Sequence, residues 1–127
     1  MYYFFKYLGW VNITLLVLVI AHFLLRRVNK YGFGNKNSSL SKISQSMSKV
    51  HPFIAGALVV SAFFHGWNLA GGIILHSGYI AFLAILLQLS IGTMVKYLRK
   101  KPFLVAHRIV GIALTVLVIV HVVLMNT

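Results

Sequence analysis

The sequence predicts an all-α integral membrane protein, a four-helix bundle whose helices run up-down-up-down across the bilayer. Three observations predict it. Hydrophobic residues make up 60% of the 127 residues, they fall into four runs, and the basic residues gather between the runs. Each run has about the 20 residues that span a hydrocarbon core, and in hydrocarbon a helix satisfies its own backbone. We expect residues 1–127 to form one domain.

The four expected helices differ in the segments that join them. They cover about residues 7–25, 50–70, 72–97 and 103–125. Residues 26–49 are polar and rich in Ser, Asn and Lys, which favours a cytoplasmic linker. The second connection, around 68–72, is very short, and the third, 96–102, is a basic turn. In the first run the positive charge follows the apolar residues and no small-residue cleavage site is visible, which favours a retained helix over a signal peptide.

The basic residues predict the orientation. Eleven of the twelve Lys and Arg lie in or beside the first and third connections, and Lys6 alone lies at the opposite end. By the positive-inside rule both connections face the cytoplasm and both termini face outward. We therefore expect a protein of the bacterial cytoplasmic membrane with lipids as partners. This topology accounts for the basic residues better than binding of nucleic acid does.

The composition excludes several kinds of chemistry. There is no cysteine, which excludes disulfides, iron–sulfur clusters, thiolate zinc sites and covalently attached c-type haem. There is no Asp or Glu, which excludes paired-acid hydrolysis, a Ser-His-Asp triad and a carboxylate proton relay.

The histidines form two pairs with one spacing. His51 and His65 are fourteen residues apart, and so are His107 and His121. On a helix fourteen residues turn about 1400°, within roughly 40° of four turns, and rise about 21 Å. Each pair therefore lies on one helix face at two depths. The second and fourth helices run in the same direction, so two imidazoles meet near the cytoplasm and two near the outer side.

Two imidazoles at one depth, on facing helices, are the axial ligands that a b-type haem needs. The sequence thus predicts two haem b groups, the inner iron bound by His51 and His107 and the outer iron by His65 and His121. The alternative is that these are ordinary buried histidines, although an ionisable side chain in a membrane span is costly and marks a functional site. A zinc site needs three converging ligands, which histidines at two depths do not provide.

Further residues are candidates for contact with the haems. Four glycines would clear space for a flat porphyrin or allow close helix packing: Gly56, Gly78, Gly92 and Gly111. Gly78 and Gly92, both on the third helix, are again fourteen residues apart. Lys49 and Arg108 adjoin the inner ligands and would pair with haem propionates, or anchor the helices at the cytoplasmic surface.

Pro52 makes the position of one ligand uncertain in this pattern. A residue before proline avoids the α conformation, so we expect His51 at the cap of its helix. If His51 does not bind iron, His22 is the substitute and would pair with His107. His76 is the corresponding spare on the outer side. Either spare would serve as a further haem ligand, a quinone contact or a proton carrier.

Two segments resemble bacterial membrane cytochrome b proteins: His51-Pro-Phe-Ile-Ala-Gly56 with His65-Gly-Trp, and His107-Arg108-Ile-Val-Gly111 with His121. Ferric-reductase-like transmembrane cytochromes and the cytochrome b of quinol-oxidising complexes share such paired-histidine helices. The resemblance covers roughly residues 49–125 and implies that the four histidines bind two b haems. It does not single out one reaction. A ferric reductase also carries a flavin and nicotinamide domain, which these residues do not contain.

The expected function is electron transfer across a membrane as a subunit of a larger redox complex, a hetero-oligomer with protein redox partners. One alternative is a stand-alone quinone-linked oxidoreductase, and another is a haem-free transporter or assembly factor. No nucleotide-binding fingerprint is present, so electrons would be exchanged with a quinone or with partner proteins. The basic cytoplasmic face would attract acidic carriers or anionic lipids.

Overall fold

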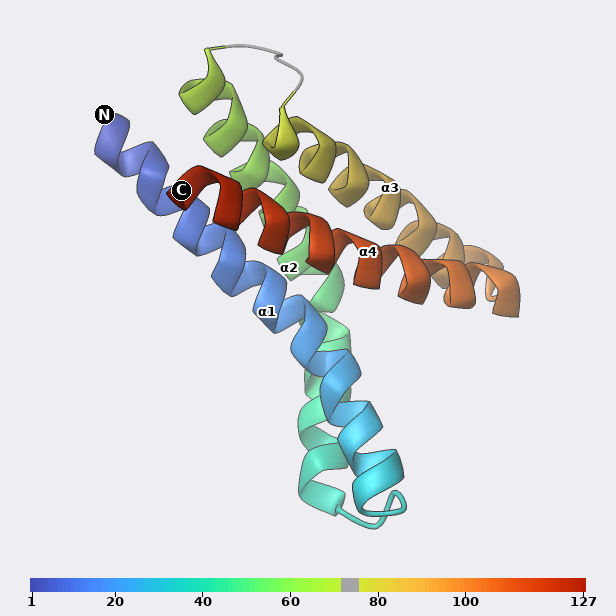
Figure 1. Ribbon diagram of the computed structural model, residues 1–127. Helices are drawn as coiled ribbons and strands as arrows, with labels where there is room; N and C mark the ends of the chain where they lie inside the picture. Colours follow the sequence, from blue (N-terminus) through green and yellow to red (C-terminus); the bar gives the residue numbers. More distant parts are fainter. Residues whose placement is uncertain (72–75) are drawn as a thin grey trace. The chain divides into compact units, whose positions relative to one another are not determined.

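The computed structural model describes residues 1–71 and 76–127, and these residues form four helices (Figure 1). The helices are α1 (Tyr2–Gly32), α2 (Ser38–Ala70), α3 (Ser77–Leu98) and α4 (Lys101–Asn126). Each is long and apolar enough to cross a membrane. The predicted all-helical class with four such helices is therefore confirmed. The chain divides into two compact units, Met1–Ala62 and Phe63–Thr127, which are described separately below.

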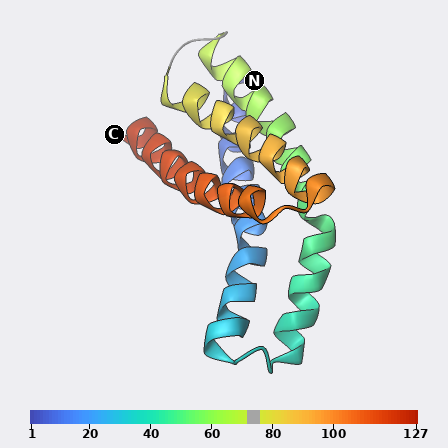
Figure 2. The same cartoon turned by 90° about the vertical axis from the view of Figure 1, so that its right-hand side faces the viewer.

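The first unit is an antiparallel hairpin of α1 and most of α2 (Figures 1 and 2). α1 has 31 residues and α2 has 33. At 1.5 Å per residue the helices are about 46 and 50 Å long, whereas the hydrocarbon core is about 30 Å thick. Both helices therefore exceed one membrane crossing. The predicted linker over 26–49 is wrong in extent, because only residues 33–37 lie outside the helices.

Asparagines build the turn between α1 and α2. Asn29 is only 7% exposed, its backbone carbonyl accepts the Asn35 N–H at 2.8 Å, and its side-chain oxygen accepts the Asn37 N–H at 3.3 Å. Asn37 in turn caps α2, since its Oδ1 accepts the Leu40 N–H at 3.1 Å. Gly34 and Asn35 take positive φ angles, 58° and 63°, which reverse the chain at little steric cost. These local bonds stop one helix and start the next within five residues.

A face of low exposure explains why the polar residues after the turn are helical. The less exposed positions recur every three or four residues on both helices. On α2 they are Leu40, Ser44, Met47 and His51, and on α1 they are His22, Leu25 and Asn29. This spacing is one face of a helix. Most of the remaining positions are polar, with Ile43 and Val50 as exposed apolar exceptions, so the segment is a largely amphipathic helix and not a linker.

His51 lies inside α2 and not at its cap, contrary to the expectation from Pro52. The reason is that α2 begins at Ser38, more than three turns earlier. Pro52 is exposed on the outer face of the helix. Its ring disfavours the α conformation at His51, but the helix continues on both sides of the pair.

The second unit consists of the last turns of α2 with the α3–α4 hairpin. His76 precedes α3 as an extended cap residue, and the expected helix start at residue 72 lies in the part of the chain outside the described residues. At the other end Arg99 takes a left-handed conformation, with φ 52°. α4 starts at Lys101 with Pro102 in its first turn, where proline needs no hydrogen-bond partner. The turn is thus residues 99–100, shorter than the expected 96–102.

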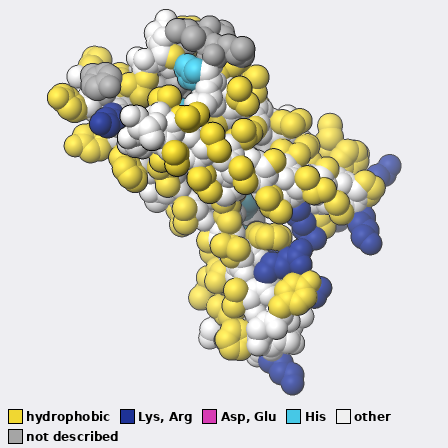
Figure 3. Space-filling view, viewed as in Figure 1, with side chains coloured by type: hydrophobic (Ala, Val, Ile, Leu, Met, Phe, Trp, Pro, Cys, Tyr) yellow, Lys and Arg dark blue, Asp and Glu magenta, His cyan; other side chains and the backbone are white. Residues whose placement is uncertain are grey.

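Few side chains are buried, and large apolar side chains cover the surface. The buried apolar residues among those described are Leu16, Leu58, Ala81, Ile85 and Leu114. One face of α4 carries apolar side chains that are 55–62% exposed, namely Ile109, Ile112, Val116 and Ile119. Figure 3 shows hydrophobic side chains spread over both units. Apolar exposure on this scale is unusual in a soluble monomer and matches helices that face lipid.

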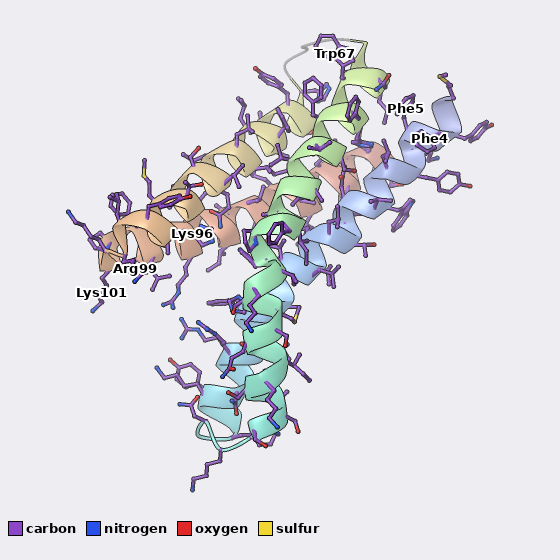
Figure 4. All side chains as sticks on the ribbon, turned by 180° about the vertical axis from the view of Figure 1, so that it is seen from behind. Phe4, Phe5, Trp67, Lys96, Arg99 and Lys101 are labelled. Atoms are coloured by element: carbon purple, nitrogen blue, oxygen red, sulfur yellow. The ribbon has the colours of Figure 1, made fainter. Side chains whose placement is uncertain are left out.

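The Lys and Arg side chains are concentrated near the helix turns. In Figure 4, Lys96, Arg99 and Lys101 gather at the α3–α4 turn and point outward. In the first unit, Lys30 lies in the last turn of α1 and Lys36 lies in the following loop, and both are exposed. Each hairpin therefore carries its positive charge at its turn.

The asparagine turn provides a first test of the fold. Asn29→Ala removes the acceptor of the Asn37 N–H, and we expect it to lower the free energy of unfolding by about 1 kcal/mol and to speed trypsin cleavage after Lys36. Both are measured on detergent-solubilised protein. Asn126→Ala, which removes an exposed side-chain bond to the Val122 carbonyl, is the control. Equal effects of the two substitutions would contradict the role given to Asn29.

Candidate functional site

All six histidines are partly buried and lie in a helix or at a helix end. His22 and His51 belong to the first unit, and the other four belong to the second. The predicted inner pair, His51 and His107, is therefore divided between the units, and its pairing stays a prediction. The predicted outer pair, His65 and His121, lies within one unit.

His121 on α4 is the centre of a polar group in the second unit. Its Nδ1 lies 2.9 Å from the hydroxyl oxygen of Ser77, the first residue of α3. His65 on α2 and His76 both lie within electrostatic range of the His121 ring. Phe63 and Phe82, whose ring centroids are 6.1 Å apart, pack the same end of α2 against α3. Three elements thus bring the two predicted outer ligands into one neighbourhood.

His76, the predicted spare ligand, acts as the cap of α3. Its Nδ1 accepts the N–H of Gly78 at 3.0 Å and the N–H of Tyr79 at 3.2 Å. A neutral imidazole that accepts at Nδ1 carries its proton on Nε2. Neither nitrogen then offers a lone pair to a metal, so this geometry explains His76 as a structural residue.

Two glycines of α3 lie against the two histidines of α4. A Cβ on Gly78 would stand 2.9 Å from His121 Cε1, and a Cβ on Gly92 would stand 3.1 Å from His107 Cε1. The contacts are fourteen residues apart on both antiparallel helices, which corresponds to about 21 Å along the axis. An edge of each imidazole therefore lies against α3 backbone that carries no side chain, at two levels along the hairpin.

The other two glycine candidates have different surroundings. A Cβ on Gly111 would meet the side-chain amide of Gln88 at 3.0 Å, and a Cβ on Gly56 would meet nothing within 4 Å. Gly111 therefore makes room for a polar side chain of α3, whereas Gly56 borders open space. The structure thus places only Gly78 and Gly92 beside predicted ligands.

Gln88 is a functional candidate that the sequence analysis missed. Its Nε2 donates to the His107 carbonyl at 2.8 Å and lies 3.4 Å from His107 Nε2. Iron binding through that ring nitrogen would require the Gln88 amide to turn away from it. A signal was present, since Gln88 is the one side-chain amide in the third apolar run, and polar residues inside a span are rarely without a role.

In the first unit, His22 and His51 are neighbours. Their ring centroids are 5.7 Å apart and the ring planes are inclined by 51°. The backbone of Val19 on α1 hydrogen-bonds the His51 ring. His22 Nε2 is buried and has no hydrogen-bond partner among the described residues. His22, expected to substitute for His51, thus lies beside it, so α1 contributes directly to the surroundings of the predicted inner ligand.

Lys49 and Arg108 are both exposed. Each lies within two residues of a predicted inner ligand on the same helix, and both side chains are exposed at the surface of the helix. The exposure suits an anchor at the membrane surface, and contact with a propionate stays a prediction.

Comparisons of the chain with protein families, with curated proteins and with solved structures found no significant match. In the described part of the chain, no three His, Cys, Asp or Glu side chains are grouped so as to hold a metal ion by themselves. The resemblance of the histidine segments to membrane cytochromes b stays a prediction.

The glycine contacts give a second test. Gly78→Ala places a methyl group against His121 and His76, and we expect a loss of about 1–3 kcal/mol in the free energy of unfolding from overpacking. Gly92→Ala, with the wider 3.1 Å contact, should cost less. Gly56→Ala is the control and should gain up to about 1 kcal/mol from helix propensity. Denaturant unfolding in detergent measures all three, and a Gly78→Ala variant as stable as Gly56→Ala would contradict the contact.

Proposed function

We propose that this protein is a b-type di-haem cytochrome that carries electrons across a bacterial cytoplasmic membrane as a subunit of a larger redox complex. The observation that carries the proposal is the α3–α4 hairpin, in which two imidazoles about 21 Å apart each lie against a glycine. Haem iron supplies reversible one-electron transfer when bound. Two imidazole ligands on each iron would leave no open position for oxygen, which suits electron transfer.

The side chains at the outer level fit a haem ligand. Iron binds the Nε2 lone pair of a neutral imidazole whose proton is on Nδ1, and metal-binding histidines usually give that proton to a neighbouring acceptor. For His121 the Ser77 hydroxyl oxygen, 2.9 Å from Nδ1, could accept this proton. His65, within electrostatic range of His121, is the proposed second ligand.

At the inner level the proposed ligands are His51 and His107. The Val19 backbone holds the His51 ring, and the Gly92 backbone bounds the His107 ring. Lys49 and Arg108 supply positive charge next to these ligands for the propionates. To bind iron through Nε2, His107 would have to release Gln88, so the inner site would require a local side-chain rearrangement.

The proposed orientation follows from the charges at the turns. Most of the Lys and Arg lie in or near the α1–α2 and α3–α4 turns, which favours a cytoplasmic position for both turns and an outer position for both termini. Alternating spans then put the inner level near the basic turns. The same turns would contact anionic lipid headgroups.

Electrons must enter and leave through other molecules. Residues 1–127 contain no nucleotide-binding fingerprint, so we propose a membrane quinone or protein redox partners as donor and acceptor. Stable copurification of a stoichiometric partner supports the role as a subunit. Quinone turnover by the purified chain alone supports an independent oxidoreductase.

Haem stoichiometry tests the proposal. A pyridine haemochrome assay on purified protein should give two haem b per chain, with sharp low-spin bands in the reduced-minus-oxidised spectrum. Substitution of His65 or His121 by Ala should remove one haem, because one axial ligand is lost at the outer site, and should leave the inner haem bound. Substitution of His51 or His107 should remove the inner haem.

Gln45→Ala, an exposed change on α2, is the control and should keep both haems. If all four histidine substitutions leave haem content unchanged, the ligand assignment is wrong. A colourless preparation from cells with ample porphyrin would end the proposal of a cytochrome.

A further inference from the structure

We infer that Ser77 is a positioning residue for His121, and that the consecutive residues His76, Ser77 and Gly78 together hold this imidazole ready to bind iron. The inference rests on the proposed function. Three contacts support it. Ser77 and Gly78 contact the His121 ring, and His76 hydrogen-bonds the backbone of Gly78.

The Ser77 contact occupies Nδ1 of His121, so Nε2 is the nitrogen that we infer would bind iron. When iron takes Nε2, the proton of the neutral ring is on Nδ1, and the only possible role for the Ser77 oxygen 2.9 Å away is to accept it. That hydrogen bond stabilises the Nδ1–H form, in which the lone pair is on Nε2. It also increases the electron density that the ring donates to the metal.

His76 and Gly78 hold Ser77 and the ring in place. His76 Nδ1 accepts two backbone N–H groups, those of Gly78 and Tyr79. These bonds fix the first turn of α3 and therefore the direction of the Ser77 side chain between them. Gly78 lets His121 Cε1, the carbon between the two ring nitrogens, approach the backbone. With Ser77 on Nδ1 and Gly78 at Cε1, rotation of the ring is blocked on that edge.

The side-chain partner that the structure shows for His121 Nδ1 is the neutral Ser77 hydroxyl. Carboxylates, which often accept the proton of a metal-binding histidine, are absent from the sequence. A neutral hydroxyl also places no charge in the membrane span, where a charge is costly. His107 differs, because its contact with Gln88 is made at Nε2. The hydroxyl support is therefore specific to the outer of the two proposed ligands on α4.

The test compares Ser77→Ala with Ser77→Thr and Ser90→Ala in the purified holoprotein. Redox titration of the two haem bands gives each midpoint potential, and the band lost in His121→Ala identifies the outer haem. Ser77→Ala should raise the outer potential, because a ring that donates less electron density stabilises ferric iron less, and should weaken outer haem retention about tenfold. It should also shift the low-spin electron paramagnetic resonance signal of that haem.

The two matched variants separate the hydrogen bond from general effects. Ser77→Thr keeps the hydroxyl and should restore the potential and the signal. Ser90→Ala removes an α3 hydroxyl that bonds only the Leu86 carbonyl and should change neither haem. An outer potential and signal unchanged in Ser77→Ala overturn the inference while leaving the proposed cytochrome intact. Absence of both haems from the unsubstituted chain overturns the proposed function itself.

Substitutions of His76 test the inference independently. Asn is among the best helix caps, so His76→Asn should keep both haems and the outer potential, whereas His76→Ala should shift the outer potential in the same direction as Ser77→Ala. Loss of the outer haem in His76→Asn would show that His76 binds iron, and would overturn the role assigned to it.

Discussion

An imidazole in hydrocarbon needs partners for its ring nitrogens, and this chain has no carboxylate to supply one. The partners that the structure shows are neutral: the Ser77 hydroxyl, the Gln88 amide and the Val19 backbone. Each belongs to the helix beside the one that carries the histidine. The need to satisfy the imidazoles therefore holds neighbouring helices in register, α1 with α2 and α3 with α4.

The register of α3 against α4 also explains the positions of the two glycines on α3. Because α3 and α4 are antiparallel, two histidines on one helix meet two residues with the same spacing on the other. Gly78 and Gly92 have that spacing. A larger residue at either place would push the imidazole away from α3 and from its polar partner. The small residues thus serve the polar contacts and not only the approach of two helices.

Sequence reasoning predicted the number and class of the helices because the length of an apolar run reflects the thickness of a membrane. It misplaced the ends of α1 and α2, since helix ends depend on backbone hydrogen bonds and caps, which hydropathy does not register. Asn29 and Asn37 decide where the first hairpin turns. Their side chains act across eight and three residues of chain, respectively, and the polar composition around them suggested a linker.

For the candidate site, the sequence showed the spacing of residues along each helix but not their contacts with other helices. Equal histidine spacing was visible in the sequence, and so was the matching spacing of Gly78 and Gly92. Ser77 and Gln88 were missed, because their importance lies in contacts with α4 residues that are 44 and 19 positions away. His76 was interpreted as a spare ligand, since its use as a cap depends on the extended backbone before α3.

The two imidazoles of α4 have the same chemistry and different surroundings. His107 is followed at once by Arg108 and lies seven residues after the α3–α4 turn, and no Lys or Arg occurs in the sequence after Arg108. His107 meets an amide at Nε2, whereas His121 meets a hydroxyl at Nδ1. Ligand identity, hydrogen bonding and nearby charge together set the potential of a haem. If the two proposed haems have the same ligands, two differences remain that would give them different potentials: the neutral partner of each imidazole and its distance from the basic turn.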